Sequence, residues 1–207
     1  TTPSSNRDTY EVLTHTKANL NMINCIYIES DKGLSRLINE VSETNPTVEF
    51  VLSDGFDGIE NKGITVGAVC GMGGELIEQI LEEGTIDKNG VTFVLQPMTK
   101  EASLRQYLCE NGFEITDEHI VKDRKIYQII CARYTGEKYE ITPTELLLGR
   151  VNIQKKDELF GEFITKTVDM VREKYNGKKS AGLNVNYELA CLIELSIIKE
   201  KYNNERK

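Results

Sequence analysis

The stretch ITVGAVCGMGGELIEQILEEG, residues 64–84, carries the strongest indication of fold in this sequence of 207 residues. Residues 64–70 form an almost continuous apolar run, which is typical of a strand covered on both faces. From 75 to 83 the apolar residues return at helical spacing, and Gly84 marks the end of that helix. Between the two lies Cys70-Gly-Met-Gly-Gly74. The stretch therefore predicts a buried strand, a tight glycine-rich turn and an amphipathic helix.

The segments on either side continue this alternation. Strand-like and helix-like patterns follow one another at 24–29, 33–41, 47–52, 91–95 and 101–110. Such alternation predicts a parallel sheet with helices on both faces. Residues 113–121 and 126–134 then read as two strands joined by a short polar turn, an antiparallel hairpin. Class I methyltransferase sheets end in a reversed strand, so we predict an α/β fold with a Rossmann-like sheet of this class.

The last third of the sequence predicts a helical hairpin. Thr142-Pro-Thr-Glu145 has the cap, the first-turn proline and the acid of a helix start. Two long amphipathic patterns follow at 155–175 and 186–202, and Asn176-Gly177 is interpreted as the end of the first. Two long helices with a short connection usually pack antiparallel. The chain then divides into a Rossmann-like domain and a C-terminal helical arm, with bounds 1–140 and 141–207.

Composition and charge narrow the classes of function. Residues 151–207 hold 11 Lys and Arg against 9 Asp and Glu, whereas residues 1–150 hold 14 against 24. A mildly basic arm on an acidic body permits nucleic-acid binding, although a solvated helical face has the same composition. No apolar run approaches the roughly 18 residues that span a bilayer. The five cysteines lack metal spacing, and we expect buried thiols in a cytoplasmic protein without a metal or membrane partner. Oligomeric state has no signature here.

Candidate cofactor-binding residues follow the predicted strands, because open α/β sheets bind ligands at the carboxyl ends of their strands. Glu29, with Ser30 after it, ends the first of these strands. A carboxylate there accepts hydrogen bonds from a ribose diol, and a solvated strand-end glutamate is the alternative. Asp54 and Gly55 follow the next strand. They predict an acceptor for an adenine amine beside a sharp backbone turn, or an ordinary Asp-Gly turn.

The glycine-rich turn is the most informative of these sites. Gly71, Met72 and Gly73 leave room for a ligand to approach the backbone, and the helix that follows offers free N–H groups. A tight strand-to-helix turn without a ligand is the alternative. Gln96 and Pro97 end the next strand, where Gln96 is a candidate to pair with a base edge or simply begins a loop.

These positions make a family resemblance specific. The residues Ala68-Val-Cys-Gly-Met-Gly-Gly-Glu-Leu-Ile-Glu-Gln-Ile-Leu-Glu-Glu-Gly84 resemble the signature of the bacterial tRNA adenine(22)-N1 methyltransferases. Further matches follow in the family's order, namely Val94-Leu-Gln-Pro97, Leu108-Cys-Glu-Asn-Gly-Phe113 and Lys125-Ile-Tyr-Gln-Ile129. The resemblance covers residues 25–150 well and the arm in kind. It implies S-adenosylmethionine as the methyl donor and N1 of a tRNA adenine as the acceptor.

The sequence departs from the family at two places. The family begins with a helix, a strand and a loop close to Asp-Ile-Gly-Ser-Asp-His-Ala-Tyr-Leu-Pro, where this chain has Pro3-Ser-Ser-Asn-Arg-Asp-Thr-Tyr10. That helix and strand are thus missing or divergent here, and Asp8 is the remnant that the resemblance implies as a catalytic residue. Met98 stands where the family usually has asparagine.

Three functions fit the sequence to different degrees. The first is methyl transfer to tRNA, in which cations of the arm hold tRNA phosphates, namely Lys155, Lys156, Lys166, Arg172, Lys178 and Lys179. The second is a catalytically impaired module of the same fold that binds RNA or protein, which the divergent N-terminus favours. The third is an NAD-linked Rossmann enzyme, and the sequence lacks the GxGxxG that it requires.

Overall fold

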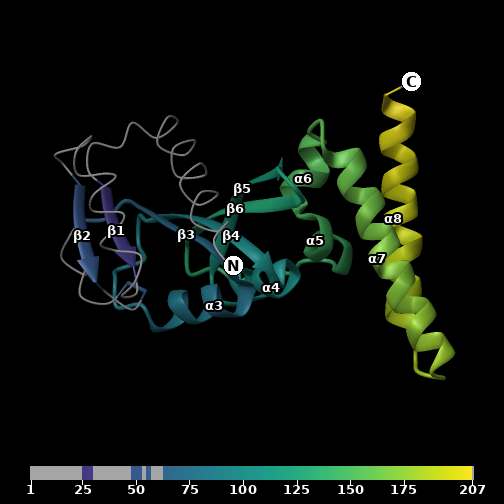
Figure 1. The fold of residues 1–207 in the computed structure, drawn as a ribbon, viewed down its shortest axis with the longest axis horizontal. Helices are drawn as coiled ribbons and strands as arrows, with labels where there is room; N and C mark the ends of the chain where they lie inside the picture. The colour runs from purple at the N-terminus through teal and green to yellow at the C-terminus, as the bar shows by residue number, and fades with distance from the viewer. Residues whose placement is uncertain (1–24, 30–47, 53–54, 57–62, 207) are drawn as a thin grey trace.

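The computed structural model describes residues 25–29, 48–52, 55–56 and 63–206 (Figure 1). Strands β1 (Cys25–Glu29) and β2 (Val48–Leu52) form a parallel pair. A second sheet has the strand order β3-β4-β6-β5, made of β3 (Val66–Gly73), β4 (Thr92–Thr99), β5 (Phe113–Lys122) and β6 (Ile126–Tyr134). β3 and β4 are parallel, whereas β6 runs antiparallel to both of its neighbours. The predicted α/β sheet that ends in an antiparallel hairpin is confirmed.

Helices α3 (Gly74–Glu83) and α4 (Glu101–Glu110) connect the strands of the second sheet and lie side by side (Figure 1). Each buries one apolar face, with Ile77 and Leu81 in α3 and Leu104 and Leu108 in α4. These faces pack on the buried strand residues of β4, among them Phe93. The apolar spacing seen in the sequence thus fixes which side of each helix covers the sheet.

The arm consists of α5 (Pro143–Leu148), α6 (Arg150–Lys155), α7 (Phe160–Ser180) and α8 (Asn186–Glu205). Figure 1 shows α7 and α8 as a long pair at one end of the molecule, beyond the β5–β6 hairpin. Thr142 caps α5 in the predicted capping box with Glu145. The arm has an apolar core of its own, which Ile120 of β5 joins. The division at residues 140 and 141 stays a prediction.

The structure corrects both predicted ends of the first long helix. Lys156 has a left-handed backbone (φ 52°), so α6 ends there and α7 begins only at Phe160. At the other end α7 runs through Gly177, and Gly182 (φ +69°) terminates it instead. Leu183 N donates to Lys178 O (2.9 Å) and Gly182 N to Lys179 O (3.1 Å), which is the Schellman pattern. The left-handed glycine of that pattern, rather than the first glycine in the sequence, ends the helix.

Helix α8 is apolar around most of its circumference. Cys191, Leu195 and Tyr202 are buried against the rest of the arm. The opposite face exposes Leu189, Ile193 and Ile197, at 43%, 55% and 61%. The apolar pattern predicted for this helix at 186–202 therefore contains residues of two different faces. Among the described helices, none has the length and apolar character needed to cross a bilayer.

Candidate functional site

The glycine-rich turn, Cys70 to Gly74, lies where β3 passes into α3. Pairing between β3 and β4 is irregular here, because the register jumps from Cys70 to Met72 and skips Gly71. Gly71 has a φ of +78°, in the left-handed region that favours glycine. The skipped residue therefore forms a bulge, which redirects the backbone just before the helix begins.

The side chain of Gln96 holds this bulge in place. Gln96 is 5% exposed, and its Oε1 accepts a hydrogen bond of 3.0 Å from the Gly71 N–H, which the bulge has removed from the strand ladder. Its Nε2 donates to the Pro97 carbonyl (3.1 Å) and to the Met98 sulfur (3.5 Å). Both ends of the amide are thus used within the protein. Gln96 positions the turn, and its predicted contact with a base edge stays a prediction.

Gly73 and Gly74 have different packing. Gly73 caps α3 with an extended backbone (φ −67°) and without a side-chain hydrogen bond. A Cβ on Gly73 would lie 3.4 Å from Thr99 Oγ1, an ordinary contact, whereas a Cβ on Gly74 would lie 2.6 Å from the Lys100 carbonyl oxygen. Gly74 therefore allows α3 to approach the β4–α4 junction. Gly71 supplies the turn, and among the described residues Gly73 has room for a Cβ that Gly74 does not have.

Burial also keeps the thiol in this turn neutral. The pKa of Cys70 is raised to about 12, first by burial, with a smaller opposing effect from the Gln96 backbone. Met72, two residues further, is 38% exposed. The turn thus presents backbone and a thioether to solvent instead of a charged nucleophile, which suits binding more than covalent catalysis.

The ends of β1 and β2 lie in register with one another. Glu29 pairs with Leu52, so both strands end at the same level. Gly55, shortly after β2, has a φ of +62°, and a Cβ there would lie 3.2 Å from the side chain of Ile80. Phe56 is buried and makes an edge contact with Phe93, 5.8 Å between ring centroids. Gly55 and Phe56 are thereby packed against α3 and the sheet.

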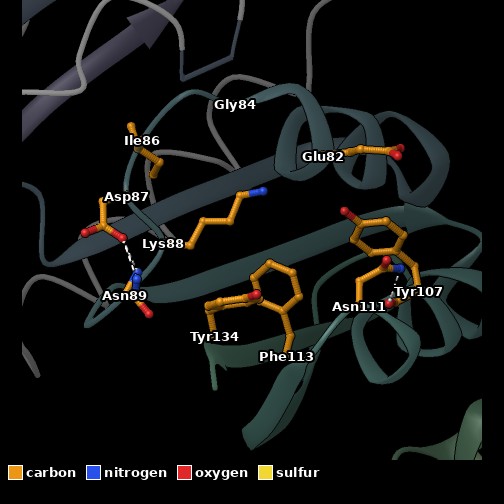
Figure 2. Close-up of a pocket in the computed structure, with 10 residues that line it drawn as sticks. All are labelled: Glu82, Gly84, Ile86, Asp87, Lys88, Asn89, Tyr107, Asn111, Phe113 and Tyr134. Carbon is orange, nitrogen blue, oxygen red and sulfur yellow. Dashed lines mark hydrogen bonds between the residues drawn. The ribbon is translucent and has the colours of Figure 1, made fainter. Parts of the chain in front are cut away.

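A hollow at the opposite edge of the sheet lies away from these strand ends (Figure 2). Its lining comes from the α3–β4 loop, the end of α4, the start of β5 and the end of β6, and includes Asn89, Tyr107, Asn111 and Tyr134. The pKa of Tyr107 is raised to about 12 by burial and by the nearby Glu82 and Glu78. Because open α/β sheets bind ligands at the carboxyl edge, the hollow is separate from the candidate site.

With this geometry in place, comparison with known proteins identifies the family. The model of the tRNA (adenine(22)-N(1))-methyltransferases, TrmK, matches residues 19–190. The chain belongs to the TrmK family. A Mycoplasma genitalium protein, provisionally named as a tRNA methyltransferase, is 29% identical over 153 residues, which cover 70% of this chain and 66% of that protein. The chain spans about half the length of a second such relative, from Mycoplasma pneumoniae.

Solved structures support the same fold. A Streptococcus agalactiae protein of the NADB-Rossmann superfamily has a TM-score of 0.73 at 24% identity, covering 85% of this chain and 80% of its own. M. capricolum TrmK, solved with S-adenosyl-homocysteine, has a TM-score of 0.66 at 17% identity, with coverages of 92% and 85%. These likenesses confirm the Rossmann-like methyltransferase fold.

The predicted cofactor residues are placed only in part. Asp8, Ser30 and Asp54 lie outside the described residues, and Glu29 is described in its backbone alone. The described residues are Gly55, Gly71, Met72, Gly73, Gln96 and Pro97. All of them except Gly55 lie where β3 and β4 end. We call this the carboxyl edge. The cofactor and substrate contacts of all these residues stay predictions.

Five of the six predicted phosphate-binding cations of the arm have acidic partners. Lys155 pairs with Asp117 and also donates to the Glu118 carbonyl (3.1 Å). Lys156 pairs with Glu205 near the end of α8, and Lys178 pairs with Glu188 across the α7–α8 hairpin. Lys166 and Arg172 pair with acids of their own helix, α7. Lys179 forms no ion pair among the described residues and lies over the ring of Tyr175, 5.4 Å from its centroid.

A buried polar cluster that the sequence analysis missed joins the arm to the body. Arg105 and Glu118 are both fully buried, with Nε of Arg105 2.7 Å from Oε1 of Glu118. Arg105 also donates to the Leu146 carbonyl (2.9 Å) and to Gln128 Oε1 (2.7 Å). The other oxygen of Glu118 accepts from the backbone N–H of Val151 at 2.9 Å. One ion pair thus connects α4, β5, β6, α5 and α6.

Backbone details explain why this cluster has no clear sequence signal. A register shift between Ile115 and Asp117 changes which residues of β5 face inward, so Glu118 lies inside with Ile120. Gly149 has a φ of +86°, and a Cβ there would lie 2.4 Å from the Glu118 carboxylate. The close approach of α6 to Glu118 requires this glycine. The one usable hint was Arg105 itself, adjacent to Leu104 on the buried face of α4.

Proposed function

We propose that this chain transfers a methyl group from S-adenosylmethionine to N1 of an adenine in tRNA. The observation that carries the proposal is the intact glycine-rich turn at the carboxyl edge of a chain that belongs to the TrmK family. The family's described target is adenine 22, which makes that position the first to test. A tRNA substrate also agrees with a cytoplasmic location, which we propose with it.

The residues present fit such a donor. β1 and β2 end in register, with Glu29 paired to Leu52. We assign Glu29 and Ser30 to the ribose hydroxyls, and Asp54 and Gly55 to the adenine ring, since carboxylates accept from hydroxyl and amine groups. Gly71, Met72 and Gly73 would line the path to the reacting base. M. capricolum TrmK binds S-adenosyl-homocysteine, which supports this cofactor class.

The reaction demands orientation more than acid–base catalysis. S-adenosylmethionine supplies an electrophilic methyl group when bound. N1 of adenine attacks with a ring lone pair, so the protein must align this nitrogen with the methyl carbon. The open backbone at Gly73 would allow a flat base to approach, and Gln96 would keep the turn in shape for it. Pro97 would border the base, and Asp8 is the proposed catalytic carboxylate.

A transcript assay tests the proposal directly. An unmodified tRNA transcript is incubated with the protein and S-adenosylmethionine, and then reverse-transcribed. Because an N1 methyl group blocks the Watson–Crick edge, we expect a strong stop one nucleotide before the modified adenine. A transcript with guanine in place of adenine 22 is the matched control. Absence of methylation on every transcript would contradict the enzyme proposal.

Calorimetry separates an enzyme from an impaired binding module. We expect S-adenosylmethionine to bind the parent and to bind Glu29→Ala at least tenfold more weakly, since one good hydrogen-bonding pair to a charged group contributes about 1.5–3 kcal/mol. Equal heats from the two proteins would remove Glu29 from the site. No heat from either, with RNA binding retained, would favour the binding module.

A further inference from the structure

The β5–β6 hairpin separates from β4 at the carboxyl edge. Pairing between β4 and β6 ends at Leu95 and Ile130, whereas pairing between β5 and β6 continues to Lys122 and Ile126. The hairpin therefore continues four residues beyond its last pair with β4, about 13 Å at 3.3 Å per residue, while β4 continues to Thr99 in its pairing with β3. Because β6 is antiparallel to β4, this extension lies at the same edge as Gln96 and the glycine-rich turn.

The hairpin tip is also fastened to the arm. Nζ of Lys122 lies 2.7 Å from a carboxylate oxygen of Glu162, in the first turn of α7. Lys166 pairs with the other oxygen of Glu162 at 2.9 Å. The hairpin tip thus contacts the arm and lies at the carboxyl edge, between these two parts of the chain.

Two cations at this tip remain unpaired. Arg124 and Lys125 are exposed, and neither forms an ion pair within the described residues, although Asp123 lies beside them. Nζ of Lys125 lies 5.0 Å from the centroid of the Tyr127 ring, so an aromatic surface adjoins the charge. Lys155, Lys156 and Lys178, by contrast, each have a carboxylate partner. A free cation binds a phosphate without first breaking an internal pair.

We propose that Arg124 and Lys125 bind phosphates of the RNA substrate and guide its target base to the carboxyl edge, with Tyr127 as a stacking surface. The proposal rests on the proposed function for the identity of the RNA as tRNA. The chemistry fits RNA because cations next to an aromatic ring suit a sugar-phosphate backbone with unstacked bases. The hairpin would thereby take the role first assigned to the arm lysines.

The test compares two charge-matched double variants. Arg124→Gln with Lys125→Gln removes the tip charge, and Lys88→Gln with Lys138→Gln removes two cations from the opposite edge of the sheet. Binding of an unmodified tRNA transcript is measured over a series of salt concentrations. We expect the tip variant to bind roughly tenfold more weakly at low salt, and its salt slope to fall by about 2, one for each phosphate contact. The control variant should behave as the parent.

Kinetics and cofactor binding keep this proposal distinct from the enzyme assignment. In the tip variant we expect a raised KM for tRNA, with kcat and the affinity for S-adenosylmethionine unchanged. A tip variant that binds RNA with the parent's affinity and salt slope overturns the hairpin proposal, even if methylation is normal. Loss of RNA binding by the tip variant supports the hairpin proposal even if the parent methylates no transcript, an outcome that overturns only the enzyme assignment. A parent that binds no RNA overturns the hairpin proposal outright.

Discussion

The glycine-rich turn and the helical arm use their polar groups in opposite ways. In the turn, one buried amide, Gln96, satisfies the N–H that the bulge frees, and the remaining surface is backbone and thioether. In the arm, Lys155, Lys156 and Lys178 are matched with carboxylates, and the fully buried Arg105–Glu118 pair joins the arm to the body. The turn thus uses its buried amide to hold the backbone, whereas these lysines use their charge to hold neighbouring elements together.

The difference shows that a charge count alone does not locate an RNA-binding surface. Residues 151–207 are net positive in sequence, yet Lys155, Lys156 and Lys178, which were predicted to bind phosphates, have acidic partners in the structure. The body is net negative, yet its hairpin presents Arg124 and Lys125 without partners among the described residues. Pairing, which depends on tertiary structure, decides which charges are available to a phosphate.

The largest effect should come from the buried Arg105–Glu118 pair, which joins the arm to the body. Arg105→Met would leave the carboxylate of Glu118 buried without its cation, and the expected loss in unfolding free energy is about 3–5 kcal/mol. Urea denaturation of the whole chain measures it. Arg150→Met is the control, because Arg150 pairs with Glu145 where both side chains are partly exposed, and the expected loss there is smaller, about 1 kcal/mol.

A double variant makes the prediction for this pair sharper. In Arg105→Met with Glu118→Gln the buried charge is gone, while an amide oxygen can still accept from the N–H of Val151. We therefore expect this variant to recover part of the stability that Arg105→Met loses. If Arg105→Met and Arg150→Met lower the free energy of unfolding equally, the buried Arg105–Glu118 pair contributes no more than a partly exposed ion pair.

The sequence carried enough information for the body because its elements depend on local patterns. The apolar run at 64–70 and the helical spacing at 75–83 produced β3 and α3. The one equally local pattern in the arm, Thr142 with Glu145, produced the capping box. The arm was less predictable, because its helix ends depend on Lys156 and Gly182 adopting left-handed backbones. The role of Gln96 could not be predicted either, because its side chain accepts a hydrogen bond from Gly71, which lies in a bulge 25 residues away in sequence.

The next effect separates the glycines of the turn. Gly74→Ala would force a methyl group to within 2.6 Å of the Lys100 carbonyl oxygen, so α3 must shift, at a cost of about 1–3 kcal/mol. Gly73→Ala meets only Thr99 Oγ1 at 3.4 Å, and we expect it to cost less, about 0.5–1 kcal/mol, because alanine is a poorer helix N-cap than glycine. Urea midpoints measure both. Methylation by Gly73→Ala then reports on substrate approach, since its fold is intact. Equal destabilisation by the two would show that the backbone at 74 adapts freely.

The smallest effect concerns the paired lysines of the arm. Hydrogen bonding to Lys178 and Lys156 lowers the pKa of Glu188 and Glu205, respectively. For Asp117, partial burial is the largest single effect and raises the pKa, but the hydrogen bonds from Lys155 and the Glu118 N–H, with nearby positive charge, together outweigh it, so the pKa is again lowered. A carboxyl group whose pKa is lower in the folded state stabilises the fold above its unfolded pKa, and this contribution disappears as the pH falls through the folded pKa.

The corresponding variant replaces Lys155, Lys156 and Lys178 with glutamine. We expect its urea midpoint to lie slightly below the parent's at pH 7, and the two midpoints to converge between about pH 5 and pH 3, where the carboxyl groups become protonated. RNA affinity should change far less than in the hairpin variant, because these lysines already have partners. A midpoint difference that persists at low pH would show that the lysines act through packing rather than charge. A tenfold loss of RNA affinity would return phosphate binding to the arm and reverse the contrast between the two regions.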